Sequence, residues 1–355
     1  MLEAYILSGS VLGVKLREIL PKTSIKLESL SGKTIAIDAY NAIYQFLSII
    51  RQPNGIPLKD HTGKVTSNLS GLLYRTSNLI ELGVKPIFVF DGTPPALKEV
   101  EIKRRSKAKE EALIRYEKAL KEGKVEEARK YAQATSRLKK YMLLDSKKLL
   151  SLMGIPLVQA PSEGEAQAAY IVKKGDAEYC ASQDYDSLLF GTPKLIRNMT
   201  ISGKRKLARK NIYINITPEI IELKTILRKH ELTLPQFIDL SILIGTDFNP
   251  NGVKGLGAKT ALKLIKKFGT FDKVLPHVKN NQIQFKPEKI QEIFLNPEVT
   301  DNYVLEWKNA DIEGIVDFLC REKDFSENRV RKALKKMEKG QKEIKEKTTL
   351  EQWFR

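Results

Sequence analysis

Three short apolar runs in this chain each lead into acidic residues. TIAID ends at Asp38, PIFVFD ends at Asp91, and EYCASQDYD carries Asp184 and Asp186. Short apolar runs of this kind are typical of strands buried on both faces, as in a parallel sheet. Ligands of open parallel sheets bind outside the carboxyl ends of the strands. The sequence therefore predicts an α/β fold with a mostly parallel sheet, and several carboxylates in one crevice.

Further acidic residues extend this predicted cluster. After a strand expected at 155–159, Glu163 and Glu165 fall where a loop turns into a helix, with Ser162 as the expected N-cap. If Glu163 lies before the first turn and Glu165 within it, both can point at one ion. Asp247, in GTDFNPNG after an apolar helix, is open to two interpretations: a seventh member of the cluster, or a turn-former.

A cluster of carboxylates needs a compensating cation, because like charges repel. Hard oxygen ligands suit Mg²⁺, with Mn²⁺ as the alternative ion. Seven carboxylates are more than one Mg²⁺ uses, so we expect two ions, which can hydrolyse a phosphodiester. None of the three histidines is near these acids in the sequence, and no Gly-rich phosphate loop with Lys-Ser/Thr is present, which disfavours zinc, iron and P-loop chemistry.

The charge of the chain favours a polyanionic partner. Its formal net charge is +18, from 61 Lys and Arg against 43 Asp and Glu. Nucleic acid is the first candidate, an anionic membrane the second, and a merely basic soluble protein the third. The two cysteines form no zinc or disulfide pattern, and we find no 18-residue apolar run or signal peptide. We expect an intracellular protein from a heat-adapted organism, given the abundance of Lys and Glu.

The chain divides into a large folded part with short ends. Residues 1–12 fit nothing downstream and are expected to be an extra segment, 13–335 to form one domain, and 336–355 to form a flexible tail. Helices are expected around 40–50, 69–82 and 235–244. The stretch 98–148 is predicted to be long, solvated, basic helix. It leaves the sheet at the crevice, where it could cover the metals, although an ordinary charged hairpin is the alternative.

The sharpest binding signal is GVKGLGAKTALKLIKKFG at 252–269. Gly-x-Gly turns lead into a helix N-terminus, where backbone N–H groups can hold a phosphate or a cation-bridged phosphate. The basic side chains there include Lys254, Lys259 and Lys263. An ordinary helix-turn-helix in the core is the alternative, but core packing does not require these lysines.

Four long motifs of the chain, in this order, resemble those of a known family. DGTPPALK, APSEGEAQAAY, ASQDYDSLLFG and GTDFNPNGVKGLGAKTALKLI are similar to motifs of the structure-specific five-prime nucleases, most closely the archaeal and eukaryotic flap endonuclease 1 family. The resemblance covers nearly everything from residue 13 onward. It implies a mostly parallel sheet, a helical arch at about 95–145, and a helix–two-turn–helix element at about 235–270. It also implies Mg²⁺-dependent removal of five-prime flaps, together with five-prime exonuclease activity, in replication and repair.

The resemblance also implies roles for individual residues. Lys98 and Arg105 match basic residues that contact the scissile phosphate, and Arg104 beside them is expected to contact DNA. Tyr44 matches a tyrosine that stacks on a base, with core packing as the alternative. Gly255 and Gly257 match a backbone turn that grips duplex DNA, usually with K⁺. The metal ligands that it implies are Asp38, Asp91, Glu163, Glu165, Asp184, Asp186 and Asp247.

The end of the chain resembles a sliding-clamp-binding motif. Leu350, Trp353 and Phe354 would share one face of a one-turn helix. The motif's usual first residue, glutamine, is Lys347 here. The alternative is a tail that packs on its own domain.

We interpret the chain as a two-metal flap endonuclease with a monomeric catalytic unit in an archaeal cytoplasm. Two other interpretations remain: an RNA-processing nuclease of a related fold, and a non-catalytic DNA-junction binder or clamp adaptor. The first would lack the helix–two-turn–helix and the clamp motif, whereas the second would tolerate loss of the acids.

Overall fold

The computed structural model describes residues 14–52, 55–124, 127–128, 131, 135, 137–201, 203–206, 213–279 and 283–353. The strands are β1 (Thr23–Ser24), β2 (Thr34–Asp38), β3 (Lys85–Phe90), β4 (Leu157–Gln159), β5 (Tyr179–Ala181), β6 (Lys194–Arg197), β7 (Gly203–Lys206), β8 (Tyr213–Ile216) and β9 (Glu219–Glu222). The helices are α2 (Ala39–Ile49), α3 (Ser67–Glu81), α4 (Glu99–Lys121), α6 (Lys140–Leu152), α7 (Gly164–Lys174), α8 (Asp186–Leu189), α9 (Leu223–His230), α10 (Leu234–Ile244), α11 (Ala258–Phe268), α12 (Phe271–Val274), α13 (Pro287–Leu295), α14 (Ile312–Val316) and α15 (Glu327–Trp353). The short 3-10 turns are η1 (Leu27–Leu30), η2 (Ala96–Lys98), η3 (Met199–Ile201) and η4 (Leu275–His277), and η5 (Asp317–Arg321) is a π-helical turn.

A mostly parallel central sheet organises the described residues, which confirms the predicted fold class. Its strand order is β1-β9-β6-β5-β2-β3-β4. The pairs β6–β5, β5–β2, β2–β3 and β3–β4 are parallel, whereas β9 is antiparallel to both of its neighbours. Strands β7 and β8 form a separate antiparallel hairpin. The strands predicted from the sequence at 34–38, 86–91 and 178–182 are thus β2, β3 and β5 inside this sheet, and the one predicted at 155–159 is the edge strand β4.

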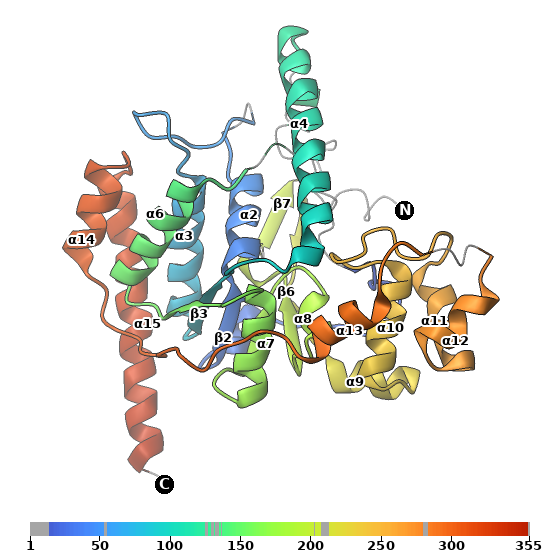
Figure 1. The fold of residues 1–355 in the computed structure, drawn as a ribbon. Coiled ribbons are helices and arrows are strands. Elements are labelled where there is room, and N and C mark those ends of the chain that lie inside the picture. The colour runs from blue at the N-terminus through green and yellow to red at the C-terminus, as the bar shows by residue number, and fades with distance from the viewer. Residues whose placement is uncertain are drawn as a thin grey trace.

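Alternate side chains of the central strands enter two different cores. On β3, Ile87 and Val89 pack with α7 and α10, whereas Phe88 and Phe90 pack with α2, α3, α6 and α15. This alternation follows from the two-residue period of a strand, and it explains why the central strands are continuously apolar. Figure 1 shows the helices on both sides of the sheet. Because helices cover both faces of the sheet, polar functional groups are expected at its carboxyl edge.

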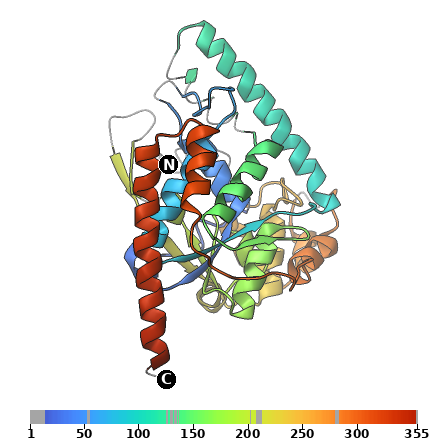
Figure 2. The same ribbon diagram turned by 90° about the vertical axis from the view of Figure 1, so that its left-hand side faces the viewer.

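Helix α4 rises away from the sheet as a long projection (Figures 1 and 2). It starts eight residues after Asp91, as expected for a basic segment that leaves the crevice. The predicted boundary at 145 is wrong, because α6 already belongs to the body of the domain. Met142 and Leu149 are buried against α3, and the side chain of Asn68 on α3 donates to the Met142 carbonyl. The other predicted arch residues, 125–126, 129–130, 132–134 and 136, lie outside the described part.

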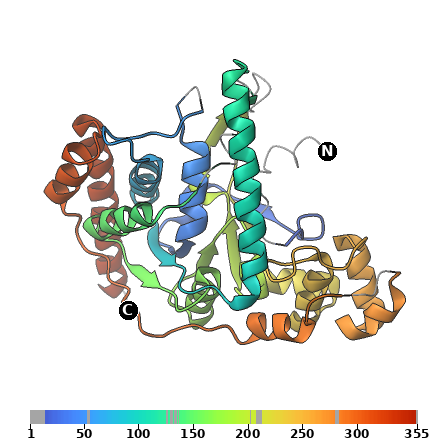
Figure 3. The ribbon, with the colours of Figure 1, turned by 45° about the horizontal axis from the view of Figure 1, so that its top comes forward.

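Helices α10 and α11 pack together beside the sheet, and in Figure 3 they lie to one side of α4. They lie in the part of the chain, about 235–270, for which a helix–two-turn–helix element is expected. A segment without helix or strand, residues 296–311, then runs back across the domain. Gln167 on α7 exchanges two 2.8 Å hydrogen bonds with the backbone of Thr300, and the Trp307 indole donates to the Pro86 carbonyl. This segment joins α13 to the C-terminal helices.

The last helix, α15, continues beyond the boundary expected at 335. Met337 is fully buried, and a Cβ on Gly340 would lie only 1.9 Å from the carbonyl oxygen of Ile80 on α3. Residues 336–340 therefore pack on the domain rather than forming a flexible tail, because Met337 and the absence of a side chain at Gly340 let α15 lie close against α3. Residues 1–13, including the expected extra segment 1–12, lie outside the described part of the chain.

Candidate metal and nucleic-acid site

The acidic residues predicted from the sequence lie at one edge of the sheet. Asp38 is the last residue of β2, and Asp91 directly follows β3. The other strand-linked acids follow β4 and β5. Glu163 is the N-cap of α7 and Glu165 lies in its first turn, so Glu163, and not Ser162 as expected, is the cap residue. This shift by one residue still leaves the two glutamates on either side of the helix start.

Each of five acids is anchored through one of its oxygens. The donors are the Asn41 N–H for Asp38 (3.0 Å), the Gly164 N–H for Asp91 (2.7 Å), the Ser182 hydroxyl for Glu165 (2.8 Å), the Asn41 amide for Asp184 (2.8 Å) and the Val14 N–H for Asp186 (3.0 Å). A Cβ at Gly164 would lie 2.5 Å from Asp91 Oδ1, so glycine is needed for that contact. Anchoring of this kind fixes the direction in which each carboxylate faces.

The anchored acids raise one another's pKa values. Desolvation is the largest cause in every case, and neighbouring carboxylates add to it. The pKa rises to about 6 for Asp38, about 7 for Asp186 and about 8 for Asp91. Those of Glu165 and Asp184 rise well above the ordinary range. The cluster therefore favours binding of positive charge, whether protons or a metal cation.

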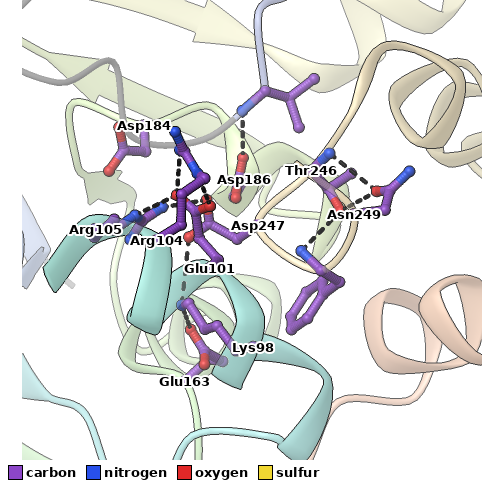
Figure 4. A network of polar contacts seen from close by, with 12 residues as sticks. Lys98, Glu101, Arg104, Arg105, Glu163, Asp184, Asp186, Thr246, Asp247 and Asn249 are labelled. Carbon is purple, nitrogen blue, oxygen red and sulfur yellow. Dashed lines mark hydrogen bonds and ion pairs between the residues drawn. The ribbon is translucent and has the colours of Figure 1, made fainter. Parts of the chain in front are cut away.

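Two basic side chains from the base of α4 face the cluster. The Lys98 ammonium forms an ion pair with Glu163 and lies 3.5 Å from Asp247, and the Arg105 guanidinium pairs with Asp247. Figure 4 shows this arrangement. Burial favours a lower pKa for both bases, but the nearby carboxylates outweigh it and raise their pKa values. Both basic side chains, Lys98 and Arg105, are thus kept positively charged beside the acidic edge of the sheet.

Glu101 is a polar residue of this site that the sequence analysis missed. It is only 2 % exposed, and it accepts hydrogen bonds from both Arg104 and Arg105. Its spacing of three and four residues from these arginines on one helix was the available signal. Glu101 orients Arg105 toward Asp247, while the 61 % exposed side chain of Arg104 stays at the surface.

Asp247 is held in a tight turn after α10. The Asn249 side chain accepts from the N–H and hydroxyl of Thr246, and donates to the Ile242 carbonyl at 2.7 Å. The Phe248 N–H completes the turn by donating to the Thr246 hydroxyl. Both interpretations of Asp247 are therefore compatible: it lies in a turn, and that turn presents its carboxylate to Lys98 and Arg105 (Figure 4).

A cavity of about 470 Å³ opens beside the acids, beneath α4. Asp91, Glu163, Lys98 and Arg105 are among its lining residues, together with Tyr40, Tyr44, Lys109 and Arg137. Tyr44 lines this cavity instead of the core, and the Lys109 ammonium lies over its ring, 4.6 Å from the centroid. Desolvation raises the pKa of the Tyr44 phenol. The cavity thus combines aromatic, cationic and acidic groups.

The donor set fits divalent cations by its chemistry, since it consists of carboxylate oxygens. As the side chains stand, no three acidic, histidine or cysteine residues among those described form a ready ligand set. Glu163 and Asp247 are instead engaged by Lys98 and Arg105. An ion bound here would compete with these two bases for carboxylate oxygens.

The second predicted surface lies at the start of α11. Lys254, Gly255, Gly257, Lys259 and Lys263 are all exposed. Gly255 has φ +90°, and a Cβ on either glycine would meet nothing within 4 Å. The glycines therefore leave the backbone open to approach from outside. At the other end of the chain, Phe354 and the side chains of Leu350 and Trp353 lie outside the described residues.

Two family models match the chain: the XPG N-terminal domain over residues 12–112 and the XPG I-region over residues 154–247. The chain is 54 % identical over 350 residues to flap endonuclease 1 of Pyrococcus furiosus, covering 97 % of this chain and 100 % of that one. It is also 54 % identical over 349 residues to flap endonuclease 1 of Staphylothermus marinus, with the same coverage.

Solved structures agree with these matches. Flap endonuclease-1 from Methanococcus jannaschii has a TM-score of 0.73 at 44 % identity, over 92 % of this chain and 98 % of that one. The catalytic core of Rad2 in complex with DNA substrate has a TM-score of 0.65 at 26 % identity, over 89 % and 96 %. Among the described residues, no helix has the length and apolar character needed to span a membrane.

Proposed function

The chain belongs to the flap endonuclease 1 family, and from that premise we propose that it is a structure-specific five-prime flap endonuclease. It hydrolyses phosphodiesters at flap–duplex junctions, and also acts as a five-prime exonuclease, in replication (Okazaki fragment maturation) and repair. The observation that carries this proposal is the carboxylate cluster, two of whose members, Glu163 and Asp247, form ion pairs with Lys98 and Arg105, beside a cavity that both basic residues line. The near full-length similarity to flap endonucleases favours it over an RNA-processing nuclease or a non-catalytic junction binder.

Two divalent ions, Mg²⁺ or Mn²⁺, bound among the seven acids would supply a nucleophile at neutral pH and stabilise charge on the leaving oxygen. The protein's own part is to hold the ligands in place. Asp38 and Asp186 are buried and each is anchored by a backbone N–H, so their carboxylates have little freedom to turn. Hydrolysis then leaves a five-prime phosphate and a three-prime hydroxyl.

Lys98 and Arg105 orient and stabilise the reacting phosphate. Their positive charges lie directly beside the carboxylates and line the cavity. A phosphate that enters between them and the acids gains two cationic partners where negative charge develops in the transition state. Glu101 keeps the Arg105 guanidinium at this place.

Tyr44 stacks on a base next to the cleaved bond, since its ring lines the same cavity as Lys98. Arg104, exposed at the base of α4, contacts the DNA backbone. The duplex lies along the start of α11, where the lysines neutralise phosphates and the Gly255–Gly257 turn holds the strand with the help of a K⁺ ion. Through these contacts the protein recognises the shape of the DNA and reads little of its base sequence.

The C-terminal residues Leu350, Trp353 and Phe354 bind a ring-shaped sliding clamp, and the catalytic unit is a monomer. Calorimetry with the clamp of the host organism tests the clamp-binding role. Trp353→Ala combined with Phe354→Ala should abolish binding, because aromatic anchors each contribute about 2 kcal/mol or more. Equal clamp affinity of wild type and double variant would exclude the role.

Incubation with a labelled five-prime flap substrate tests the main proposal. Cleavage at the junction is expected with Mg²⁺ and not with EDTA. Asp184→Ala should abolish cleavage and leave flap binding in EDTA nearly unchanged, because phosphate contacts elsewhere supply most of the affinity. Asp317→Ala is the matched control, since Asp317 is exposed and pairs with Arg321 within its own turn. Cleavage by Asp184→Ala at the wild-type rate would refute the metal assignment.

A further inference from the structure

Asn41 connects two acids of the cluster that come from different strands. Its backbone N–H donates to Asp38 Oδ1 at 3.0 Å, and its side-chain amide donates to Asp184 Oδ2 at 2.8 Å. Asp38 ends β2 and Asp184 follows β5, which pairs directly with β2. Asn41 is only 7 % exposed, so its polar groups depend on partners inside the protein. One buried residue therefore contacts two carboxylates of the site.

The direction of the Asn41 amide is fixed by its other partners. The Gln183 backbone N–H, which can only donate, points at Asn41 Oδ1 at 3.1 Å. A flipped amide would set its NH₂ group against this N–H, and its oxygen against the Asp184 carboxylate. Both contacts would be repulsive. The NH₂ group of Asn41 is thus constrained to face Asp184.

A chain of hydrogen bonds extends this constraint to a neighbouring turn. Gln45, one turn along α2, donates to Asn41 Oδ1 at 2.5 Å, and its own carbonyl accepts from the Thr200 hydroxyl at 2.9 Å. Thr200 is buried on η3, which leads into the β7–β8 hairpin. Every donor in the series Thr200, Gln45, Asn41 points toward the carboxylate. A cavity of about 10 Å³ beside these residues has room for about one water.

We propose that Thr200, Gln45 and Asn41 form a positioning relay for Asp184. The relay holds one oxygen of Asp184 in place, so that the carboxylate is already oriented to receive a metal ion. This rests on the proposed function, in which Asp184 is a metal ligand. Partners that orient metal ligands in this way typically change metal affinity or activity by about 10- to 100-fold when removed.

The test measures metal binding without catalysis. Mn²⁺ is titrated into DNA-free protein, and the free ion is followed by electron paramagnetic resonance. Asn41→Leu keeps the side-chain size but removes the hydrogen bonds, and Thr200→Val removes the donor at the far end. Asn68→Leu is the control, because Asn68 is fully buried and, among the described residues, its side chain donates to Met142 and Ser146 on α6 and to no acid of the cluster. Flap-DNA affinity in EDTA and thermal unfolding are measured for each protein.

Asn41→Leu should weaken Mn²⁺ binding by about tenfold or more, and Thr200→Val should weaken it less. DNA affinity in EDTA should stay at the wild-type value, and Asn68→Leu should bind Mn²⁺ normally even if it unfolds at a lower temperature. Wild-type Mn²⁺ affinity in Asn41→Leu would overturn the relay, as would equal weakening in Asn68→Leu. If Asn41→Leu does not fold, wild-type Mn²⁺ affinity in Thr200→Val overturns it.

The two proposals fail in distinguishable ways. Wild-type protein that binds Mn²⁺ and cleaves a five-prime flap, together with an unaffected Asn41→Leu variant, overturns the relay alone. Wild-type protein that binds no Mn²⁺ and cleaves no flap overturns the proposed function, and the relay with it.

Discussion

Replacing Lys98 by methionine should impair the enzyme in two separable ways. The Lys98 side chain is only 17 % exposed and lies beside both Glu163 and Asp247. Its charge also lowers the pKa values of Asp38 and Asp91, against the larger effect of desolvation. Methionine is of similar length but carries no charge. The variant therefore loses a cation at the phosphate, and its carboxylates bind protons more tightly.

The size of each effect can be worked out from the site. Loss of one positioned cation at the reacting phosphate costs about 3 kcal/mol, or roughly a hundredfold in the rate of the chemical step. Burial and the neighbouring carboxylates raise the pKa of Asp91 to about 8, so this residue binds a proton around neutral pH when no metal is present. Each further rise of its pKa by about one unit reduces its ionised fraction up to about tenfold. The acid limb of the pH–rate profile should therefore move to higher pH.

Single-turnover cleavage of a five-prime flap between pH 6 and pH 9, at saturating DNA, measures both effects. Lys103→Met is the control, because the Lys103 side chain is 80 % exposed and pairs with Glu99 on its own helix. We expect the control to match the wild type. If Lys98→Met changed only the dissociation constant for DNA, with an unaltered rate and an unaltered pH profile, the reasoning would be refuted.

Three further predictions concern other parts of the molecule. Because burial raises the pKa values of the clustered carboxylates, the free energy of unfolding of the metal-free protein should fall as pH rises from about 4 to 8. Added Mg²⁺ should therefore raise Tm more at pH 8 than at pH 5, and an equal rise at both would contradict this pH dependence. Alanine at Lys254, Lys259 and Lys263 together should flatten the log–log salt dependence of duplex binding by about 0.9 for each lost phosphate contact, whereas an unchanged slope would mean that α11 does not face DNA. Gly340→Ala should destabilise the protein by about 1–3 kcal/mol, because its Cβ would collide with the backbone of α3, whereas Gly257→Ala, with open space around it, should leave Tm nearly unchanged.

The central strands and the acidic edge were predictable because both depend on local patterns. A continuous apolar run marks a strand covered on both faces, and a parallel sheet gathers whatever follows each strand at one edge. That logic placed Asp38, Asp91, Glu163 and Asp184 correctly in the fold. Lys98 and Arg105 came from the resemblance to a family, because nothing in their spacing alone points to a carboxylate such as Asp247, more than 140 residues away.

Other features depend on contacts between distant segments and left no clear local signal. Asn41 looks like an ordinary polar residue of α2, and its role is visible only when β5 brings Asp184 beside it. The packing of Met337 on α3 was missed because the segment around it is rich in Lys and Glu, which is typical of solvated tails. The burial of Glu101 likewise appears only in the folded chain, where its partner Arg105 also pairs with the distant Asp247.

An anomalous difference map from a crystal soaked in Mn²⁺ would test the central claim most directly. We predict two peaks among the carboxylates at the carboxyl edge of β2, β3 and β5, with Asp184 and Asp91 among the nearest ligands. The same map from crystals of Asp184→Ala should lose at least one of the two peaks. A wild-type map with no peak in this cluster, or with Mn²⁺ bound only elsewhere on the protein, would contradict the account.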